Sequence, residues 1–147
     1  MITVKNLLET KGDAVYSTTP DATVLSALTE MADKDVGILI VMDGDRMVGV
    51  ISERDFVQEI ARTGVCIIDE PVAGHMTREV ITVRPGDTIE ECMNLMTYRR
   101  IRHLPVLENG KLAGLVSIGD VVKATISSRE MTIEQLENYI EGRGYGQ

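Results

Sequence analysis

The chain has 147 residues, of which 15 are Lys or Arg and 23 are Asp or Glu, so its formal net charge is −8 at pH 7. Because nucleic-acid backbones are bound by basic surfaces, this acidic balance argues against a nucleic-acid partner. Apolar residues make up 44% of the chain, which excludes an intrinsically disordered protein. The longest apolar run, residues 36–42, is far shorter than the roughly 20 residues of a membrane span. The first residues lack the charged and apolar regions of a secretory signal, so we expect none. We therefore expect a cytoplasmic protein with no membrane partner.

A tandem repeat organises the chain. Residues 15–57 align with residues 80–122 at a constant offset of 65 and without gaps, and ten of the 43 aligned positions are identical. Chance alone gives roughly two or three identities at average residue usage. The apolar pattern agrees as well, since pairs such as Val24 and Ile89 are alike in character. The sequence therefore predicts a duplicated structural unit.

Each copy begins with an extended segment and a helix. Residues 16–19 and 81–84 are extended runs that stop at a proline, and the residue before proline favours extended conformations. Apolar residues then recur at the i, i+3, i+4 and i+7 positions in both copies, which predicts a helix with one buried face. Asp87 or Thr88 can cap the second of these helices.

Each copy continues with a hairpin and a second helix. Two apolar runs are joined by a glycine-containing turn, at residues 43–46 in the first copy and 108–111 in the second. The second helix is expected to begin after Ser52 or Ser117, and Gly64 is placed to end the first of these helices. The predicted unit is therefore β-α-β-β-α, and the fold class is α+β.

We expect the two copies to pack with pseudo-two-fold symmetry into one globular module, because a unit of about 50 residues buries too little apolar surface to be stable alone. A capping box at Thr132–Gln135 predicts an amphipathic C-terminal helix, packed on the module or on a second subunit. The expected division of the chain is a first repeat at 1–63, a connector at 64–72, a second repeat at 73–127, and a C-terminal helix with its tail at 128–147.

A motif of Gly, two aliphatic residues, Ser, two variable residues and Asp occurs twice, at residues 49–55 and 114–120. One interpretation is a helix cap, with the serine as N-cap and the acidic residue three positions later. The other is a ligand site, because a carboxylate at this position can accept two hydrogen bonds from a vicinal diol such as a ribose. The serine would then reach the sugar or the phosphate, so the motif favours a nucleoside over a bare phosphate.

A basic segment, Tyr98–Val106, stands out in this acidic chain. One interpretation is an exposed strand entrance with ordinary surface arginines. Alternation along the strand would instead send Arg102 and His103 to opposite sides, so at least one would point inward and need a partner. A ligand phosphate would supply that partner. The first copy has neither Arg nor His there, and Arg54, which lacks a counterpart in the second copy, is the cation that would compensate.

These features together resemble the tandem cystathionine-β-synthase (CBS) domain pair, or Bateman module, of the stand-alone bacterial type. The resemblance covers about residues 1–127 and rests on the gapless duplication, the element order, the doubled motif and the Arg-x-Arg-His-Leu-Pro-Val segment. It implies a homodimeric module that binds adenosine derivatives such as AMP, ADP, ATP, NAD or S-adenosylmethionine in the cleft between the repeats. It assigns the ribose hydroxyls to Asp55 and Asp120, and the phosphate to Arg102 and His103.

The resemblance also implies that hydroxyl residues of the entry segments and the strand entrances line the cleft. The full set of expected ligand contacts is Ser17, Thr18, Val36, Gly37, Ile38, Ser52, Arg54, Asp55, Thr82, Ile101, Arg102, His103, Pro105, Ser117 and Asp120.

We expect a regulatory module whose ligand signals to an unidentified protein effector in trans. The alternative is a structural dimerisation module with vestigial ligand sites. We expect no catalytic residues and no metal, because His75 and His103 are the only imidazoles and neither lies in a catalytic constellation or at metal-ligand spacing. Cys66 and Cys92 are expected to be reduced and structural.

Overall fold

The computed structural model describes residues 1–128, 137, 138 and 140. The chain forms two compact units. The repeat-1 unit comprises Val15–Val80, and the repeat-2 unit comprises Met1–Ala14 together with the chain from Ile81 onward. Each unit contains one copy of the duplicated segment and is described on its own below.

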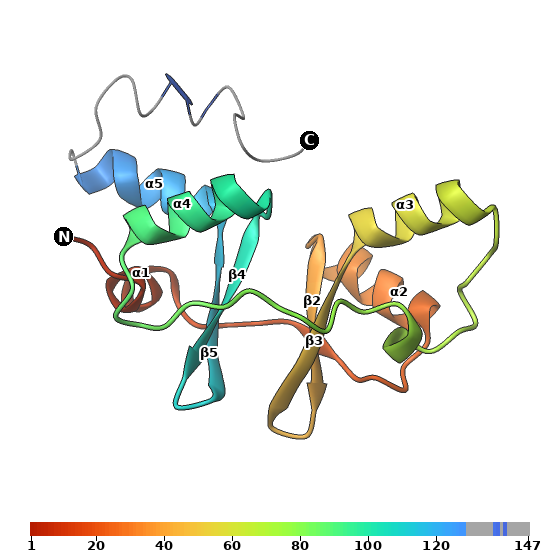
Figure 1. Cartoon of the computed structure of the whole chain (residues 1–147). Coiled ribbons are helices and arrows are strands. Elements are labelled where there is room, and N and C mark those ends of the chain that lie inside the picture. The colour runs from red at the N-terminus through yellow and green to blue at the C-terminus, as the bar shows by residue number, and fades with distance from the viewer. Residues whose placement is uncertain (129–136, 139, 141–147) are drawn as a thin grey trace. The chain divides into compact units, whose positions relative to one another are not determined.

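The repeat-1 unit contains a three-stranded sheet and two helices (Figure 1). In the sheet, β1 runs parallel to β2, and β2 forms an antiparallel hairpin with β3. Its elements are β1 (Ser17–Thr18), α2 (Val24–Lys34), β2 (Ile38–Asp43), β3 (Arg46–Ser52), α3 (Glu53–Thr63) and the short 3-10 helix η1 (Val72–Gly74).

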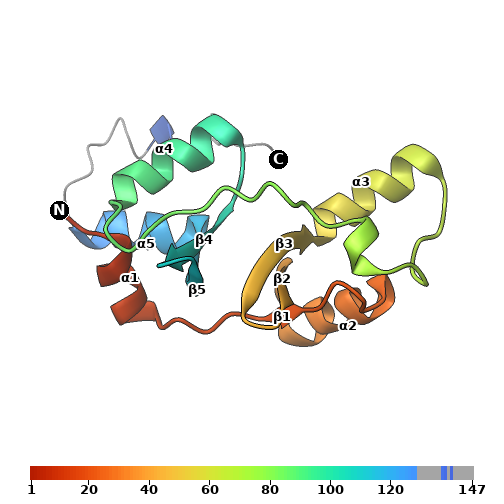
Figure 2. The same ribbon diagram turned by 60° about the horizontal axis from the view of Figure 1, so that its bottom comes forward.

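The repeat-2 unit is built around the antiparallel hairpin of β4 and β5. Helices α4 and α5 pack against each other, and each also packs on the hairpin. Helix α1 contacts β5 and α5 (Figure 2). The elements are α1 (Val4–Lys11), α4 (Ile89–Arg99), β4 (His103–Glu108), β5 (Lys111–Ser117) and α5 (Ile118–Ser128). The expected extended segment at 81–84 is reduced to an isolated parallel bridge between Val83 and Val106. The mixed α+β fold confirms the predicted fold class, although the first strand of the second copy is not formed.

Local sequence signals set the ends of these elements. The hydroxyls of Thr23 and Thr88 accept hydrogen bonds from the first turns of α2 and α4, and Gly64 ends α3 in the left-handed conformation with φ of 69°. In the second hairpin, Asn109 and Gly110 both have positive φ, at 53° and 78°. Two positive φ values give the type I′ turn whose twist matches paired strands. The predicted caps and turns are therefore confirmed.

The segment that leads into each copy packs with the other copy. Helix α1 precedes the first copy in sequence, but its Val4 N–H donates to Asp87 O at 2.8 Å in the repeat-2 unit. Residues 70–77 precede the second copy, yet Thr77 exchanges two backbone hydrogen bonds with Val50 of β3 in the repeat-1 unit. The compact units therefore do not have the same boundaries as the sequence repeats. The expected boundaries of the repeats stay a prediction.

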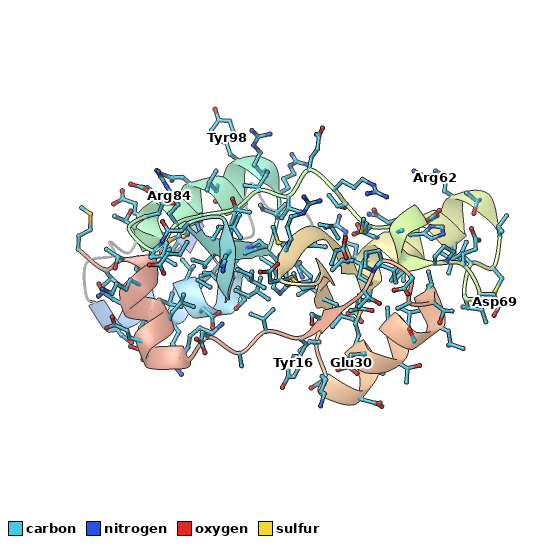
Figure 3. The ribbon with its side chains drawn as sticks, turned by 90° about the horizontal axis from the view of Figure 1, so that it is seen from below. Tyr16, Glu30, Arg62, Asp69, Arg84 and Tyr98 are labelled. Atoms are coloured by element: carbon cyan, nitrogen blue, oxygen red, sulfur yellow. The ribbon has the colours of Figure 1, made fainter. Side chains whose placement is uncertain are left out.

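Each unit has its own apolar core. Phe56, Leu39 and Ile51 are among the buried residues of the repeat-1 unit, and Met96 and Leu104 are among those of the repeat-2 unit. Tyr98, by contrast, projects away from α4 into solvent (Figure 3). The expected C-terminal helix lies almost wholly outside the described residues. No helix in the described part of the chain has both the length and the apolar character that a membrane span requires.

The two cysteines are expected to react at very different rates. Cys92 is fully buried, and its burial, with smaller contributions from Asp87 and Glu91, raises the pKa of the thiol to about 12. Since the thiolate is the nucleophile, iodoacetamide at about pH 8 should alkylate exposed Cys66 and leave Cys92 unmodified in the folded protein. Mass spectrometry before and after urea unfolding measures this, and labelling of both residues in the native state would contradict the burial of Cys92.

Candidate functional site

The expected ligand residues fall into two groups, one in each unit. The group in the repeat-2 unit consists of Thr82, Ile101, Arg102, His103, Pro105, Ser117 and Asp120, and the group in the repeat-1 unit consists of Ser17, Thr18, Val36, Gly37, Ile38, Ser52, Arg54 and Asp55.

Strand pairing brings the polar residues of the repeat-2 group together. His103 at the start of β4 lies opposite Ser117 at the end of β5. The backbone is tied at the same place, because Ile118 N–H donates to Arg102 O at 2.9 Å. Arg102 is exposed and His103 is half-buried, so the histidine is the member of the pair that points inward. The sequence required that at least one of them do so.

Asp120 is held by a reciprocal cap at the start of α5. Its backbone N–H donates to Ser117 Oγ at 3.2 Å, and its carboxylate Oδ2 accepts from Ser117 N–H at 2.8 Å. The capping interpretation of the motif is therefore correct for this copy. Lys11 Nζ at the end of α1 also donates to Oδ2, at 2.6 Å. Burial by itself raises the pKa of Asp120, but the hydrogen bonds from Lys11 and Ser117 outweigh it and hold the pKa below its usual value.

His103 is in an environment that favours the neutral imidazole. Burial is the largest effect and lowers its pKa, and the positive charges of Lys11 and Arg102 lower it further, while Asp120 acts in the opposite direction. A neutral imidazole offers one donor and one acceptor nitrogen. The repeat-2 group therefore combines a fixed carboxylate, an imidazole that favours its neutral form and the cation of Arg102, and Lys11 adds a second cation beside it.

In the repeat-1 group, the strand entrance and the helix start are also adjacent. Ile38 pairs with Ser52 across the hairpin, and Glu53 N–H donates to Gly37 O at 3.1 Å. Ser52 Oγ accepts from Asp55 N–H at 3.2 Å. Ser52 therefore caps α3 in the same way as Ser117 caps α5. Arg54 is exposed in the first turn of α3.

Ser17 and Thr18 reach this region through β1. They pair with Ile40 and Val41 of β2, and Thr18 is half-buried while Ser17 is exposed. In the repeat-2 unit, Thr82 is half-buried next to the Val83 bridge.

The two groups are chemically unequal. In the repeat-2 unit, the side chain of Leu8 lies against Gly114. In the repeat-1 unit, the side chain of Met76 lies against Gly49 in the same way. The segments that precede the two copies therefore correspond at an offset of 68 residues. The same offset aligns Lys11 with Glu79, and no lysine takes the matching position in the repeat-1 unit. Among the residues that the structure describes, no ion pair involves Asp55. The two motif aspartates therefore differ in the charged groups around them.

Pro105 and Ile101 make backbone hydrogen bonds that hold β4 and the residues before it in place. Pro105 is buried, and its carbonyl accepts from Val83 N–H at 3.0 Å. Ile101 is half-buried, and its N–H donates to Met96 O at 3.1 Å. In the repeat-1 unit, Val36 takes the place of Ile101 and its N–H donates to Met31 O at 3.0 Å.

An open depression of about 460 Å³ adjoins the repeat-2 group on α5. Arg102 borders both the depression and the group of expected site residues. The depression is lined by Arg102, Ile118, Gly119, Val122, Lys123, Ile126 and Ser127.

His75 has a structural role in the repeat-1 unit. Its side chain is 7% exposed and is bound on both ring nitrogens, with Nδ1 2.8 Å from Glu59 Oε2 and Nε2 3.3 Å from Glu70 Oε1. It thereby ties α3 to the segment that contains η1. Within the described residues, no group of three or more His, Cys, Asp or Glu side chains could hold a metal ion.

The comparisons with known proteins agree with this architecture. The model of the CBS domain matches residues 1–62 and 72–127. The chain belongs to the CBS-domain family. It is a regulatory module with two CBS repeats, so the family resemblance read from the doubled motif is confirmed.

Relatives of this CBS-domain protein are similar over most of its length. The chain is 35% identical to CBS domain-containing protein CBSX3, mitochondrial, of Arabidopsis thaliana, over 97% of this chain and 73% of that protein. A solved protein with CBS domains from Burkholderia ambifaria is 41% identical with a TM-score of 0.81, covering 89% of this chain and 98% of that one. The structure of CBSX2 in complex with AMP is 26% identical with a TM-score of 0.71, covering 88% and 100% of the two chains.

Sequence analysis missed Lys11. It lies 109 residues from Asp120 and outside the aligned copies. The equivalent residue before the second copy, 68 positions later, is Glu79 and not a lysine. No local pattern marks it, because only the packing of α1 in the repeat-2 unit brings it to the carboxylate.

Proposed function

We propose that this CBS-domain protein senses an adenosine nucleotide, of the class that includes AMP, ADP, ATP and NAD, and transmits its occupancy to a protein partner in trans. The observation that carries the proposal is the repeat-2 group, in which a capped carboxylate lies near an inward histidine and an arginine. The AMP complex of CBSX2, a protein of the same fold, supports adenosine as the ligand class.

The chemistry of the group suits a ribose and a phosphate at once. A carboxylate is an acceptor only, so the ionised Asp120 can take hydrogen bonds from sugar hydroxyls, and its lowered pKa keeps it ionised. Arg102 offers five N–H donors in a fork that matches phosphate oxygens, and His103 adds a donor. Ser117 uses its hydroxyl oxygen as an acceptor for the cap of α5, and its side chain also stabilises the ionised Asp120.

The repeat-1 group is proposed to contribute sugar and base contacts through Ser17, Thr18, Ser52 and Asp55, with Arg54 as its cation. Since this group lacks the arginine and histidine pair of the other copy, its affinity for a phosphorylated ligand should be lower. We propose that the repeat-2 group is filled first and that a cytoplasmic homodimer is the working form.

Ligand binding is expected to raise the melting temperature of the protein. Binding to the folded state alone adds about 2.7 kcal/mol at a ligand concentration 100 times the dissociation constant, and this raises the melting temperature of a chain of this size by several degrees. A thermal-shift panel of AMP, ADP, ATP, NAD and S-adenosylmethionine tests it. Inosine monophosphate and free ribose 5-phosphate serve as controls for recognition of the base.

The outcomes separate the two candidate roles. A shift with at least one adenosine compound, larger than with either control, supports a sensor. The absence of any shift up to millimolar concentration, in a protein that elutes as a stable dimer, would instead favour the structural dimerisation module with vestigial sites.

A further inference from the structure

The shortest side-chain hydrogen bond to a residue of the candidate site is donated by a residue outside the CBS motifs. Lys11 Nζ lies 2.6 Å from Asp120 Oδ2 and 2.8 Å from the carbonyl oxygen of Leu115. The contact is internal to the repeat-2 unit. The side chains of Lys11 and Asp120 are 32% and 22% exposed, so solvent and a ligand can both reach the pair.

Two hydrogen bonds occupy the same oxygen of the Asp120 carboxylate. An ionised carboxylate oxygen has two lone pairs. Oδ2 already accepts from Lys11 Nζ and from Ser117 N–H, the latter at 2.8 Å. The bond from Ser117 belongs to the cap of α5 and is retained as long as the helix starts there. The other oxygen, Oδ1, has lone pairs that can accept from a sugar hydroxyl.

A vicinal diol is gripped most strongly when each carboxylate oxygen takes one hydroxyl. This arrangement requires a lone pair of Oδ2, and the bond from Lys11 is the one that can be given up. Lys11 is the last residue of α1, and Gly12 follows it with φ of 95°, so its long side chain leaves the end of a helix. A lysine side chain has a flexible four-carbon stem, and it can swing away without moving the backbone.

We propose that Lys11 is a specificity-determining residue that competes with the ribose diol for Asp120, so that binding of a ribonucleotide in the repeat-2 unit displaces its ammonium group. This inference rests on the proposed function, because it assumes that Asp120 binds the sugar. Lys11 acts as an internal competitor that lowers the affinity of Asp120 for the diol. A higher concentration of ligand is therefore needed to fill the site.

The competition is confined to one of the two copies. The repeat-1 unit has Glu79 at the position that matches Lys11, and Asp55 has no ion pair among the described residues. The two carboxylates therefore differ in what a ligand must displace, although the motifs that carry them are the same.

The test measures the coupling between the lysine and the ligand's 2′-hydroxyl. Calorimetry with AMP and with 2′-deoxy-AMP is carried out on the wild-type protein, Lys11→Met and Lys11→Arg. Methionine keeps the length of the stem and removes the charge, whereas arginine keeps a cation opposite Asp120. Lys5→Met, an exposed lysine of the same helix, is the matched control. Thermal melts confirm that each variant is folded, and Lys11→Gln replaces Lys11→Met if the methionine variant is not.

Lys11→Met should bind AMP about 5-fold more tightly, the effect of removing one partly exposed ion pair. Its affinity for 2′-deoxy-AMP, which needs only Oδ1, should change less than about 2-fold. Lys11→Arg keeps a cation on Asp120 and should not show the gain in AMP affinity. Lys5→Met should bind both ligands as the wild type does.

Two results would overturn the inference, and they are distinguishable. Weaker or unchanged AMP binding in Lys11→Met, in a protein whose wild type binds AMP, would show that Lys11 positions Asp120 or contacts the ligand instead of competing with it. Failure of the wild type and all variants to bind any adenosine nucleotide would remove the proposed function, and this inference with it.

Discussion

Replacement of Asp120 by alanine should weaken binding of an adenosine nucleotide to the repeat-2 group by at least about 100-fold, because two hydrogen bonds to a charged acceptor are lost. The protein should stay folded. The cap of α5 loses about 1 kcal/mol, and the partly exposed ion pair with Lys11 contributes at most about another 1 kcal/mol. Isothermal titration calorimetry measures the affinity, and a thermal melt without ligand measures the stability.

Asp87→Ala is a matched control for this experiment. Asp87 also accepts a hydrogen bond from a backbone N–H three residues away, that of Arg84 at 2.7 Å, and it lies in the same unit, but it is not among the expected ligand residues. Loss of a carboxylate that accepts a backbone hydrogen bond is therefore common to both variants, whereas loss of the sugar contact is specific to Asp120. Equal affinity of the wild type and Asp120→Ala would show that the carboxylate is only a helix cap.

The glycine that opens each motif should tolerate a methyl group in one copy and not in the other. A Cβ at Gly49 would lie 2.7 Å from the carbonyl oxygen of Thr77 and 2.9 Å from Met76 Sδ. The Thr77 carbonyl cannot move away freely, because it accepts from Val50 N–H at 3.0 Å while Thr77 N–H donates to Val50 O at 2.8 Å. We expect Gly49→Ala to destabilise the protein by about 3 kcal/mol through overpacking against fixed backbone.

Gly114→Ala is the internal comparison. Its Cβ would lie 2.8 Å from Cδ2 and 3.0 Å from Cδ1 of Leu8, both at the end of a side chain. Leu8 can change its rotamer, so the expected cost is about 1 kcal/mol or less. Urea denaturation of the two variants measures the difference in the free energy of unfolding. A loss for Gly114→Ala as large as that for Gly49→Ala would contradict the distinction between backbone and side-chain contact.

The unequal environment of the two motifs bears on how the module would respond to its ligand. A ligand shifts a conformational equilibrium only by the difference between its affinities for the two states. In the repeat-2 unit, a diol that takes Oδ2 must separate Lys11 from Asp120, which frees the end of α1 from that contact. The repeat-1 unit offers Asp55 no such lysine. We therefore expect the two sites to differ in both affinity and effect.

Several features of the fold could be predicted from the sequence because they depend on neighbouring residues. The periodic apolar positions of Val24 and Ile89 placed α2 and α4, and the turn at Asn109 placed the second hairpin. Ser52 and Ser117 were predicted as caps, and both accept the expected backbone hydrogen bond. Such signals are local, since helix caps and tight turns are formed within three or four residues.

The tertiary structure decided what the local pattern leaves open. The sequence repeats begin with the segments that precede each copy, whereas the backbone bonds of Val4 to Asp87 and of Thr77 to Val50 show which compact unit each of these segments belongs to. The sequence also predicts the same role for Asp55 and Asp120, although among the described residues only Asp120 forms an ion pair with a lysine, Lys11. Contacts between residues 109 positions apart leave no periodicity in the sequence, because they depend on which surfaces the folded segments bury against each other. The duplicated sequence therefore determined the shape of both copies, and packing of the unpaired segments determined how the two candidate sites differ.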